Sequence, residues 1–198
     1  MTILIKPPKN GTKGRCVKTS QAVFQTIVSR IALLNSMNIL DFGTGTGLLA
    51  FKIAPMVRHV TGIDLSANML KQIEDKNTPE LFVEPLLHDM LEHPLERRFN
   101  GIVSSMAMHH VENTRKLFET FYAHLKSDGF MAIADLEKED GTFHSHGNEG
   151  VHYFGFEREP LRQIMKDAGF ENIRFHTACV VKKGEKEYPI FLVTATKG

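Results

Sequence analysis

The chain has 198 residues, of which 42% are hydrophobic, a size and composition typical of one globular domain with a substantial core. Its 24 basic and 23 acidic residues leave a formal net charge of +1, which disfavours a broad electrostatic surface for nucleic acid. Two cysteines argue against a disulfide scaffold, and no apolar run approaches the roughly 20 residues that span a bilayer. We therefore expect a cytoplasmic protein with no membrane partner.

The first 18 residues are rich in lysine, proline and glycine and form the most basic stretch of the chain. We expect residues 1–18 to be a flexible arm and residues 19–198 to form a single domain. Apolar residues at helical spacing then predict a helix over 20–34, with Ser20 as its cap.

Strands and helices alternate over the next hundred residues. Apolar runs predict five strands, and the segments between them have helical spacing. The predicted strands are 37–42, 57–64, 81–88, 99–106 and 130–135, and the predicted helices are 48–56, 66–77 and 113–125. This alternation indicates a parallel sheet with helices on both faces.

The C-terminal part departs from this alternation. Residues 136–156 are polar, rich in glycine and histidine and predicted to be irregular, and a helix follows over 157–168. Two further strands, 170–181 and 188–196, are joined by about six residues, whereas a parallel crossover needs about a dozen. The predicted fold is therefore a doubly wound, Rossmann-like α/β sheet of seven strands whose last strand is antiparallel.

Residues 39–50 read as a buried strand, a glycine turn and the start of a helix. Gly43, Gly45 and Gly47 permit backbone angles closed to other residues and let a ligand approach the main chain. The helix N-terminus that follows offers N–H groups suited to carboxylates and phosphates. This stretch alone predicts a nucleotide-type pocket.

Carboxylates follow several of the predicted strands, at the edge where doubly wound sheets bind ligands. These residues are Asp41, Asp64, Asp89 and Asp135. Asp64 follows Gly45 by 19 residues, close to the spacing at which an acid binds a ribose diol. Acids at successive strand ends beside a glycine turn form a narrower pattern than any single surface acid.

The segment Asp41-Phe42-Gly43-Thr44-Gly45-Thr46-Gly47 resembles motif I of the class I S-adenosylmethionine-dependent methyltransferases. Residues 61–70 look like the second motif of that family, and His88-Asp89-Met90 is similar to its third. Residues 99–111 and 125–130 resemble its fourth segment and the turn before its fifth strand. The resemblance covers about residues 36–196 and is to small-molecule-type members, similar to methyltransferase domains 11 and 25.

The resemblance implies S-adenosyl-L-methionine as cofactor, S-adenosyl-L-homocysteine as product and a small-molecule acceptor. Asp41 would face the cofactor's ammonium group or the nearby backbone, and Asp64 would hold the ribose hydroxyls. Asp89 would accept a hydrogen bond from the adenine amino group, with Met90 on the ring. The full set of cofactor-binding residues implied is Asp41, Gly43, Thr44, Gly45, Gly47, Asp64, Leu65, Met69, Asp89, Met90 and Ser105.

Two other functions stay open at this point. Residues 45–50 fit the G-x-G-x-x-A pattern of NAD(P)-dependent oxidoreductases, and Tyr122 and Lys126 have the Y-x-x-x-K spacing of short-chain dehydrogenases. We interpret that spacing as chance, because Tyr122 falls on an amphipathic helix where it reads as partly buried packing. A non-catalytic module that binds S-adenosylmethionine is the other alternative.

Histidine titrates near neutral pH and is the natural base if the acceptor carries a proton that must leave. His110 follows the fourth strand, and His144 and His152 lie in the irregular loop, so these three are the predicted catalytic residues. The neighbours His109 and His110 would point apart on a regular helix or strand. His144, His146 and His152 can also form a zinc or iron set, but we interpret the loop as acceptor-pocket lining and expect no metal.

Overall fold

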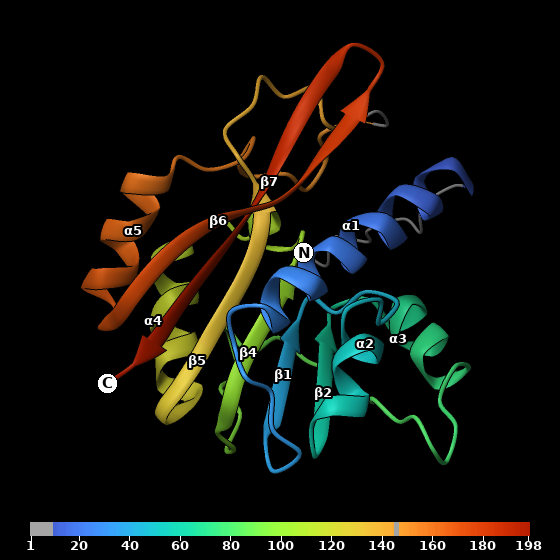
Figure 1. Cartoon of the computed structure of the whole chain (residues 1–198), viewed down its shortest axis with the longest axis vertical. Coiled ribbons are helices and arrows are strands. Elements are labelled where there is room, and N and C mark those ends of the chain that lie inside the picture. The colour runs from blue at the N-terminus through green and yellow to red at the C-terminus, as the bar shows by residue number, and fades with distance from the viewer. Residues whose placement is uncertain (1–9, 145–146) are drawn as a thin grey trace.

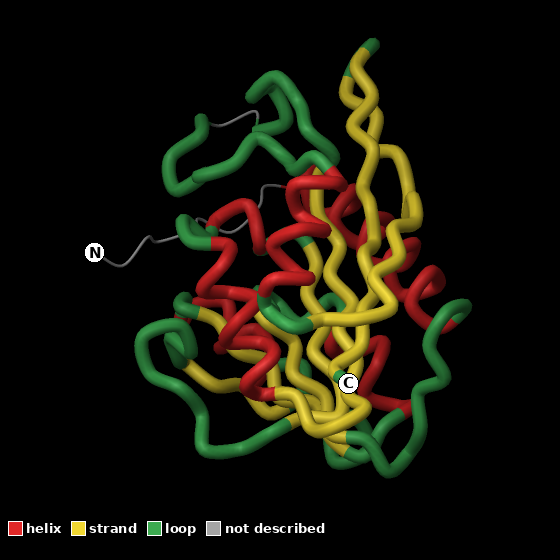
Figure 2. The backbone as a smooth tube through the Cα atoms, turned by 90° about the vertical axis from the view of Figure 1, so that its left-hand side faces the viewer, coloured by secondary structure: helices red, strands yellow, loops and turns green. Residues whose placement is uncertain are grey.

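The computed structural model describes residues 10–144 and 147–198. A seven-stranded sheet runs in the order β3-β2-β1-β4-β5-β7-β6 (Figure 1), with helices on both of its faces (Figure 2). The strands are β1 (Asn38–Phe42), β2 (His59–Asp64), β3 (Glu84–Leu87), β4 (Phe99–Ser105), β5 (Leu125–Leu136), β6 (Phe170–Lys183) and β7 (Lys186–Lys197). The helices are α1 (Asn10–Val28), α2 (Ala50–Ile53), η1 (Ala54–Met56), α3 (Ala67–Glu74), η2 (Met108–His110), α4 (Thr114–His124) and α5 (Arg158–Asp167).

Strands β1 to β5 are parallel, and β7 runs antiparallel between β5 and β6. The predicted doubly wound sheet with a reversed last strand is therefore confirmed. Because parallel strands point the same way, the carboxyl ends of β1, β2, β4 and β5 share one edge of the sheet (Figure 1). This carboxyl edge is where open α/β sheets bind ligands.

The first helix differs from its prediction. Helix α1 begins at Asn10 and ends at Val28, whereas the apolar pattern predicts 20–34. Ser20 is therefore buried inside the helix instead of capping it. Half of the basic stretch expected to be a flexible arm is helical, and α1 packs against β6. Residues 1–9 of that arm lie outside the described residues, so the proposed division of the chain stays a prediction.

The hydrophobic core consists of two clusters, one on each face of the sheet. Neighbouring strand residues alternate between them: Ile39 and Val103 belong to one cluster, and Leu40 and Ile102 to the other. All four are fully buried. Strands buried on both faces are held rigidly, so the residues that follow β1 and β4 have fixed positions.

Tyr122 lies in α4, whereas Lys126, its partner in the Y-x-x-x-K spacing, is the second residue of β5. The Tyr122 ring packs edge-on against Phe170 at a centroid distance of 5.4 Å, and Lys126 Nζ lies 3.2 Å from Asn100 Oδ1. The two side chains contact different partners, which supports chance spacing.

None of the helices in the two described ranges is long and apolar enough to cross a bilayer.

The connection from β5 to α5, residues 137–157, is called the β5–α5 loop below. The described residues of this loop are irregular apart from one bridge between Glu137 and Phe156. The Thr142 and Tyr188 hydroxyls are 2.8 Å apart, and Lys186 Nζ donates to Asp140 Oδ2 at 2.8 Å. The loop is therefore docked on the β6–β7 hairpin. The two lie side by side at the top of Figure 1.

Candidate active site

The glycine turn after β1 has the strained backbone that its sequence predicts. Gly43, Gly45 and Gly47 have φ values of +61°, +54° and +79°. A Cβ on Gly43 would lie 2.4 Å from the Cβ of Ala107, which follows β4. Gly43 is therefore required both by its backbone angle and by the close approach of the neighbouring strand end.

Asp41 is buried at the end of β1, with 1% of its surface exposed. Its Oδ2 accepts a hydrogen bond of 2.7 Å from Thr44 Oγ1, and the Ala50 N–H at the start of α2 is also close. Burial raises the pKa of the Asp41 carboxyl to about 7; the Thr44 hydrogen bond opposes this rise and the Asp64 charge adds to it. The described groups that act on this carboxyl are a hydroxyl, a backbone N–H and another acid, so the site is suited to receive a cationic ligand.

Asp64 connects the glycine turn to the start of α3. Its Oδ2 accepts from the Gly45 N–H at 2.8 Å, and its Oδ1 accepts from the Ser66 N–H at 2.9 Å. An ionised carboxylate has about four acceptor positions, so capacity remains for two ligand hydroxyls. Leu65 beside it is 49% exposed, which leaves an apolar side chain available to a ligand ring.

The other predicted cofactor residues fall into two groups. Asp89 Oδ1 accepts from the Leu91 N–H at 3.0 Å in the loop after β3, and Ser105 ends β4 at the carboxyl edge. Met69 and Met90 are 7% and 1% exposed and pack in the core. Contact of the Met90 side chain with a ligand ring stays a prediction, and such contact would need the chain around it to open.

The predicted catalytic histidines are only partly brought together. The ring centroids of His110 and His144 are 6.0 Å apart, whereas the exposed His152 contacts this region through its backbone N–H, which donates to the His109 carbonyl at 3.0 Å. His146 lies outside the described residues. His109 is the residue that the sequence reasoning missed, because it lies in the one-turn helix η2, where its ring and that of His110 are 4.2 Å apart rather than pointing away.

Asp135 orients His109. Its Oδ1 accepts from His109 Nδ1 at 2.7 Å, and its Oδ2 accepts from the His109 N–H at 3.1 Å. Both side chains are buried, at 2% and 0% exposure. The signal in the sequence was an acid after the fifth strand and a histidine after the fourth, which parallel pairing brings to the same edge.

The surroundings of His110 and His144 favour the neutral form of these two rings. Burial, with His109 adding to it, lowers the pKa of His110. Burial and the neighbouring His109 and His110 lower the pKa of His144 to about 4. A general base works best with a pKa near the working pH, so His144 is poorly matched to that role.

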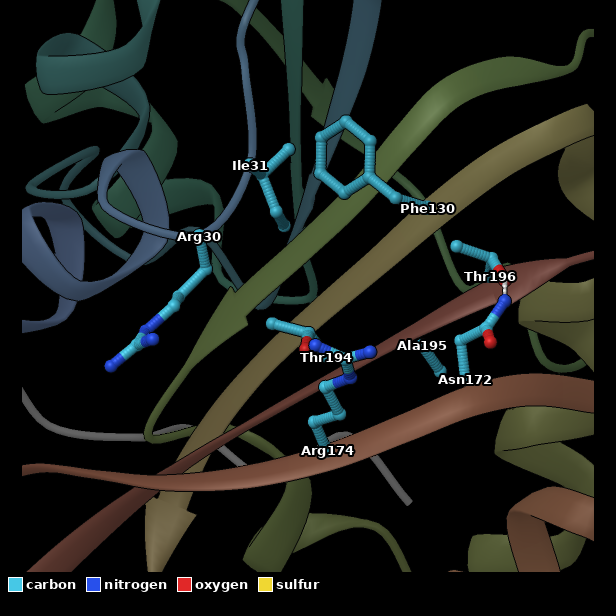
Figure 3. A pocket seen from close by; sticks show the side chains of 8 residues that line it. All are labelled: Arg30, Ile31, Phe130, Asn172, Arg174, Thr194, Ala195 and Thr196. Atoms are coloured by element: carbon cyan, nitrogen blue, oxygen red, sulfur yellow. Dashed lines mark hydrogen bonds between the residues drawn. The ribbon is translucent and has the colours of Figure 1, made fainter.

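A pocket of about 160 Å³ lies elsewhere (Figure 3). The pocket is lined by Phe130 in the middle of β5, Asn172 near the start of β6 and Thr196 near the end of β7, together with Arg30 and Arg174. The register of β4 and β5 places Phe130 opposite Gly101, far from the strand end at Ser105. This pocket therefore lies away from the carboxyl edge and is separate from the candidate site.

Comparison with known proteins identifies the family. A family model described as a methyltransferase domain matches residues 18–174. An uncharacterised methyltransferase of Schizosaccharomyces pombe is 32% identical over 155 residues, which are 70% of this chain and 55% of that protein. Phosphoethanolamine N-methyltransferase 1 of Arabidopsis thaliana is 30% identical over 152 residues, 74% of this chain and 31% of that protein. The match thus spans about half or less of these relatives' length.

Solved structures agree on the fold. Magnesium protoporphyrin IX methyltransferase of Synechocystis PCC 6803 with bound SAH has a TM-score of 0.73 at 16% identity, covering 98% of this chain and 90% of that one. Phosphoethanolamine N-methyltransferase 2 of Haemonchus contortus in complex with S-adenosyl-L-methionine has a TM-score of 0.70 at 19% identity, with 91% and 56% covered. The chain therefore belongs to the methyltransferase domain family and has the fold of the class I S-adenosylmethionine-dependent methyltransferases, as its motifs predict.

Proposed function

We propose that the protein is an S-adenosyl-L-methionine-dependent methyltransferase that acts on a small-molecule acceptor. One observation carries the proposal: the glycine turn lies between two carboxylates, Asp41 and Asp64, and Asp64 accepts directly from the turn's Gly45 N–H. A nicotinamide dinucleotide carries a pyrophosphate, and the buried Asp41 would repel that charge. The methyl donor carries a sulfonium and an ammonium group, which Asp41 would attract.

The residues present fit this cofactor. The raised pKa of Asp41, about 7, falls again when a cation lies beside it, so ligand binding would stabilise the ionised form. Asp64 retains acceptor positions for the two ribose hydroxyls, and the exposed Leu65 offers an apolar contact for adenine. The roles of Met69, Asp89, Met90 and Ser105 stay as the motifs predict them.

The cofactor, when bound, supplies a methyl group that its sulfonium already activates. The chain's own task is to place the acceptor in line with that methyl group and to exclude water. The β5–α5 loop and the histidines at the carboxyl edge are placed to do both. Of the three predicted catalytic histidines, we favour His110 as the base, because burial and the neighbouring histidines lower the pKa of His144 to about 4, and His152 contacts the cluster through its backbone N–H.

Relatives with a named acceptor support the small-molecule class. The names of those above refer to phosphoethanolamine and magnesium protoporphyrin IX, which share little chemistry. The support is therefore for a class of acceptor and not for either compound.

Cofactor binding is tested by isothermal titration of the full chain with S-adenosyl-L-methionine and S-adenosyl-L-homocysteine. Asp64→Asn keeps the shape of the side chain and removes its charge, and we expect affinity to fall at least about tenfold, as for loss of a hydrogen bond to a charged group. Glu119→Gln, the same change at an exposed position on α4, is the matched control and should leave affinity unchanged.

The alternatives give different results. Binding of NADH without binding of S-adenosyl-L-methionine would reverse the proposal in favour of an oxidoreductase. Binding of the methyl donor with no methylation across a panel of metabolites would instead favour a non-catalytic binding module.

A further inference from the structure

Three histidine rings meet at the carboxyl edge, and they come from two distant segments. His109 and His110 lie in η2 after β4, and His144 lies in the β5–α5 loop. Each residue offers one ring nitrogen as a possible ligand, and these three nitrogens all lie within 4.8 Å of one another. We propose that His109, His110 and His144 form a binding site for one divalent transition-metal ion. This set differs from the His144, His146 and His152 set that the sequence suggests.

The hydrogen bonds of two rings expose the correct nitrogen. His110 Nδ1 lies 2.7 Å from the Gly150 carbonyl, which can only accept, so Nδ1 carries the proton and Nε2 keeps a free lone pair. His109 Nδ1 lies 2.7 Å from Asp135 Oδ1, and Asp135 also accepts from two backbone N–H groups. Both bonds match the usual outer shell of a metal-binding histidine, a carbonyl or carboxylate on the second ring nitrogen.

His144 supplies an independent observation. Its Nδ1 is buried and has no hydrogen-bond partner among the described residues. A buried polar atom without a partner is costly, and an ion beside it would remove that cost. The ordinary interpretation, buried histidines that satisfy one another, explains His109 through Asp135 but leaves the His144 nitrogen unexplained.

The geometry fits three imidazole ligands after a small adjustment. Zinc–nitrogen bonds of about 2.0–2.1 Å in a tetrahedral site place ligand nitrogens roughly 3.3 Å apart. The widest separation here must therefore shrink by about 1.5 Å at most, and His144 belongs to a loop outside the sheet, where such a shift is easiest. Three protein ligands leave a coordination position open, and imidazole suits Zn²⁺, Co²⁺, Ni²⁺ and Fe²⁺.

This site also points to a class of acceptor, an inference that rests on the proposed function. An open position on such an ion binds an oxygen anion and lowers the pKa of a bound hydroxyl. An acceptor hydroxyl would lose its proton to solvent, and its oxygen would then form a bond to the methyl carbon. The carbon–sulfur bond would break with its electron pair left on sulfur, giving a methyl ether and S-adenosyl-L-homocysteine. With an ion bound, His110 would act as a ligand, and this role would replace the role as base described under the proposed function.

The test is a titration of the full chain with Co²⁺, followed by ligand-field absorption and by metal analysis after dialysis. We expect one Co²⁺ per chain. His110→Ala and His144→Ala should each weaken binding at least about tenfold, whereas His93→Ala, a change at an exposed histidine outside the cluster, should not. Asp135→Asn should cost about 10- to 100-fold, the usual effect of losing an outer-shell partner.

S-adenosyl-L-homocysteine binding is measured on every variant. A variant that still binds this ligand is folded, so its loss of Co²⁺ binding reports on the metal site alone. No Co²⁺ binding by a wild-type chain that binds S-adenosyl-L-homocysteine would overturn the metal site and leave the proposed function standing. Co²⁺ binding that the two histidine variants retain would also overturn it.

Discussion

The part of the carboxyl edge that holds Asp41 and Asp64 is called the cofactor side below. Its two acids are fixed by a hydroxyl group and by backbone N–H groups that belong to the turns after β1 and β2. Thr44 binds Asp41 from three residues away, and Asp64 is held by the N–H groups of Gly45 and Ser66. The histidine cluster of His109, His110 and His144 is assembled differently. Its bonds to Asp135 and Gly150 span 26 and 40 residues.

The difference has a physical consequence for each side. The donors to Asp41 and Asp64 belong to the turns that follow β1 and β2, so the cofactor side depends on the sheet itself. The histidine cluster depends on a loop that docks on the β6–β7 hairpin, so it can be lost while the sheet stays intact. A substitution on the cofactor side should therefore affect stability and cofactor binding together. A substitution that displaces the loop should affect metal binding and leave cofactor binding intact.

The largest effect is expected for Gly43→Ala. The new Cβ would meet the Ala107 Cβ at 2.4 Å, and the residue would have to keep a φ of +61°. Backbone strain and overpacking together should lower the free energy of unfolding by about 4 kcal/mol, measured by denaturant titration, and abolish cofactor binding.

Gly184→Ala is the matched control for that variant. Gly184 has a φ of +60° in the β6–β7 turn, and a Cβ there would meet nothing within 4 Å. This variant should lower the free energy of unfolding by about 1 kcal/mol, because only the backbone strain remains. Equal losses in the two variants would mean that the contact with Ala107 relaxes freely, and the cofactor side would then be less rigid than argued above.

The next effect concerns Asp41 and pH. Its folded-state pKa of about 7 lies above the ordinary value of 3.8, so the folded state holds a proton that the unfolded state has lost. The contribution of Asp41 to the free energy of unfolding is therefore fully present below about pH 4 and is lost as the pH rises towards 7. Between about pH 5 and pH 8 the wild-type free energy of unfolding should fall by about 2–3 kcal/mol relative to Asp41→Asn.

Two further measurements test whether Asp41 causes this pH dependence. Saturating S-adenosyl-L-methionine should reduce the pH dependence of the wild-type chain, because the cationic ligand favours the ionised carboxyl. Asp89→Asn, which removes the charge of a half-buried acid in the loop after β3, should leave the pH dependence in place. If the wild type and Asp41→Asn vary with pH in parallel, then Asp41 is already ionised in the free protein.

Gly155→Ala should affect the histidine cluster and not the cofactor side. A Cβ at Gly155 would lie 2.0 Å from the Glu137 carbonyl oxygen, and the φ of Gly155 is +68°. The variant should break the bridge between Glu137 and Phe156 and displace the β5–α5 loop at a cost of about 2 kcal/mol. S-adenosyl-L-homocysteine affinity should change less than about twofold, while Co²⁺ affinity should fall about tenfold.

A loss of both affinities in Gly155→Ala would contradict the separation of the two sides. It would show that the loop, and not the sheet alone, supports the cofactor turn. Gly147→Ala, in the same loop with a φ of +100° but nothing within 4 Å of a Cβ, controls for backbone strain without the collision.

The sequence was sufficient where structure depends on local pattern. Glycine spacing and apolar strands predicted the positions of Asp41, Gly45 and Asp64, because each is set by the end of a strand. The start of α1 was not predictable in this way. Residues 10–18 are polar and contain Gly11 and Gly14, so the helix lacks an apolar pattern there, and α1 instead packs against β6.

The histidine cluster was only half visible in the sequence. The loop histidines and His110 could be named as candidates, but their partners could not. Met106 has a φ of +61°, which turns the chain sharply after β4 and brings His109 and His110 together in η2. Neither this turn nor the docking of the β5–α5 loop follows from residue spacing, because both depend on contacts between segments far apart in the sequence.

The smallest effect is expected for Tyr153→Phe, which tests how the loop is held. Tyr153 Oη donates to the Glu112 carbonyl at 2.8 Å, while its ring packs 5.1 Å from Phe156, so the variant removes one hydrogen bond and keeps the packing. Removing it should cost about 1 kcal/mol of local stability. Amide hydrogen exchange at His152 and Tyr153, whose N–H groups bind the His109 carbonyl, should speed up about fivefold.

Tyr122→Phe on α4 is the control, with exchange in the loop unchanged. Faster exchange throughout β1 and β2 would mean that the loop and the cofactor side open as one unit, whereas acceleration confined to the loop would show that the histidine cluster opens independently of the sheet that carries it.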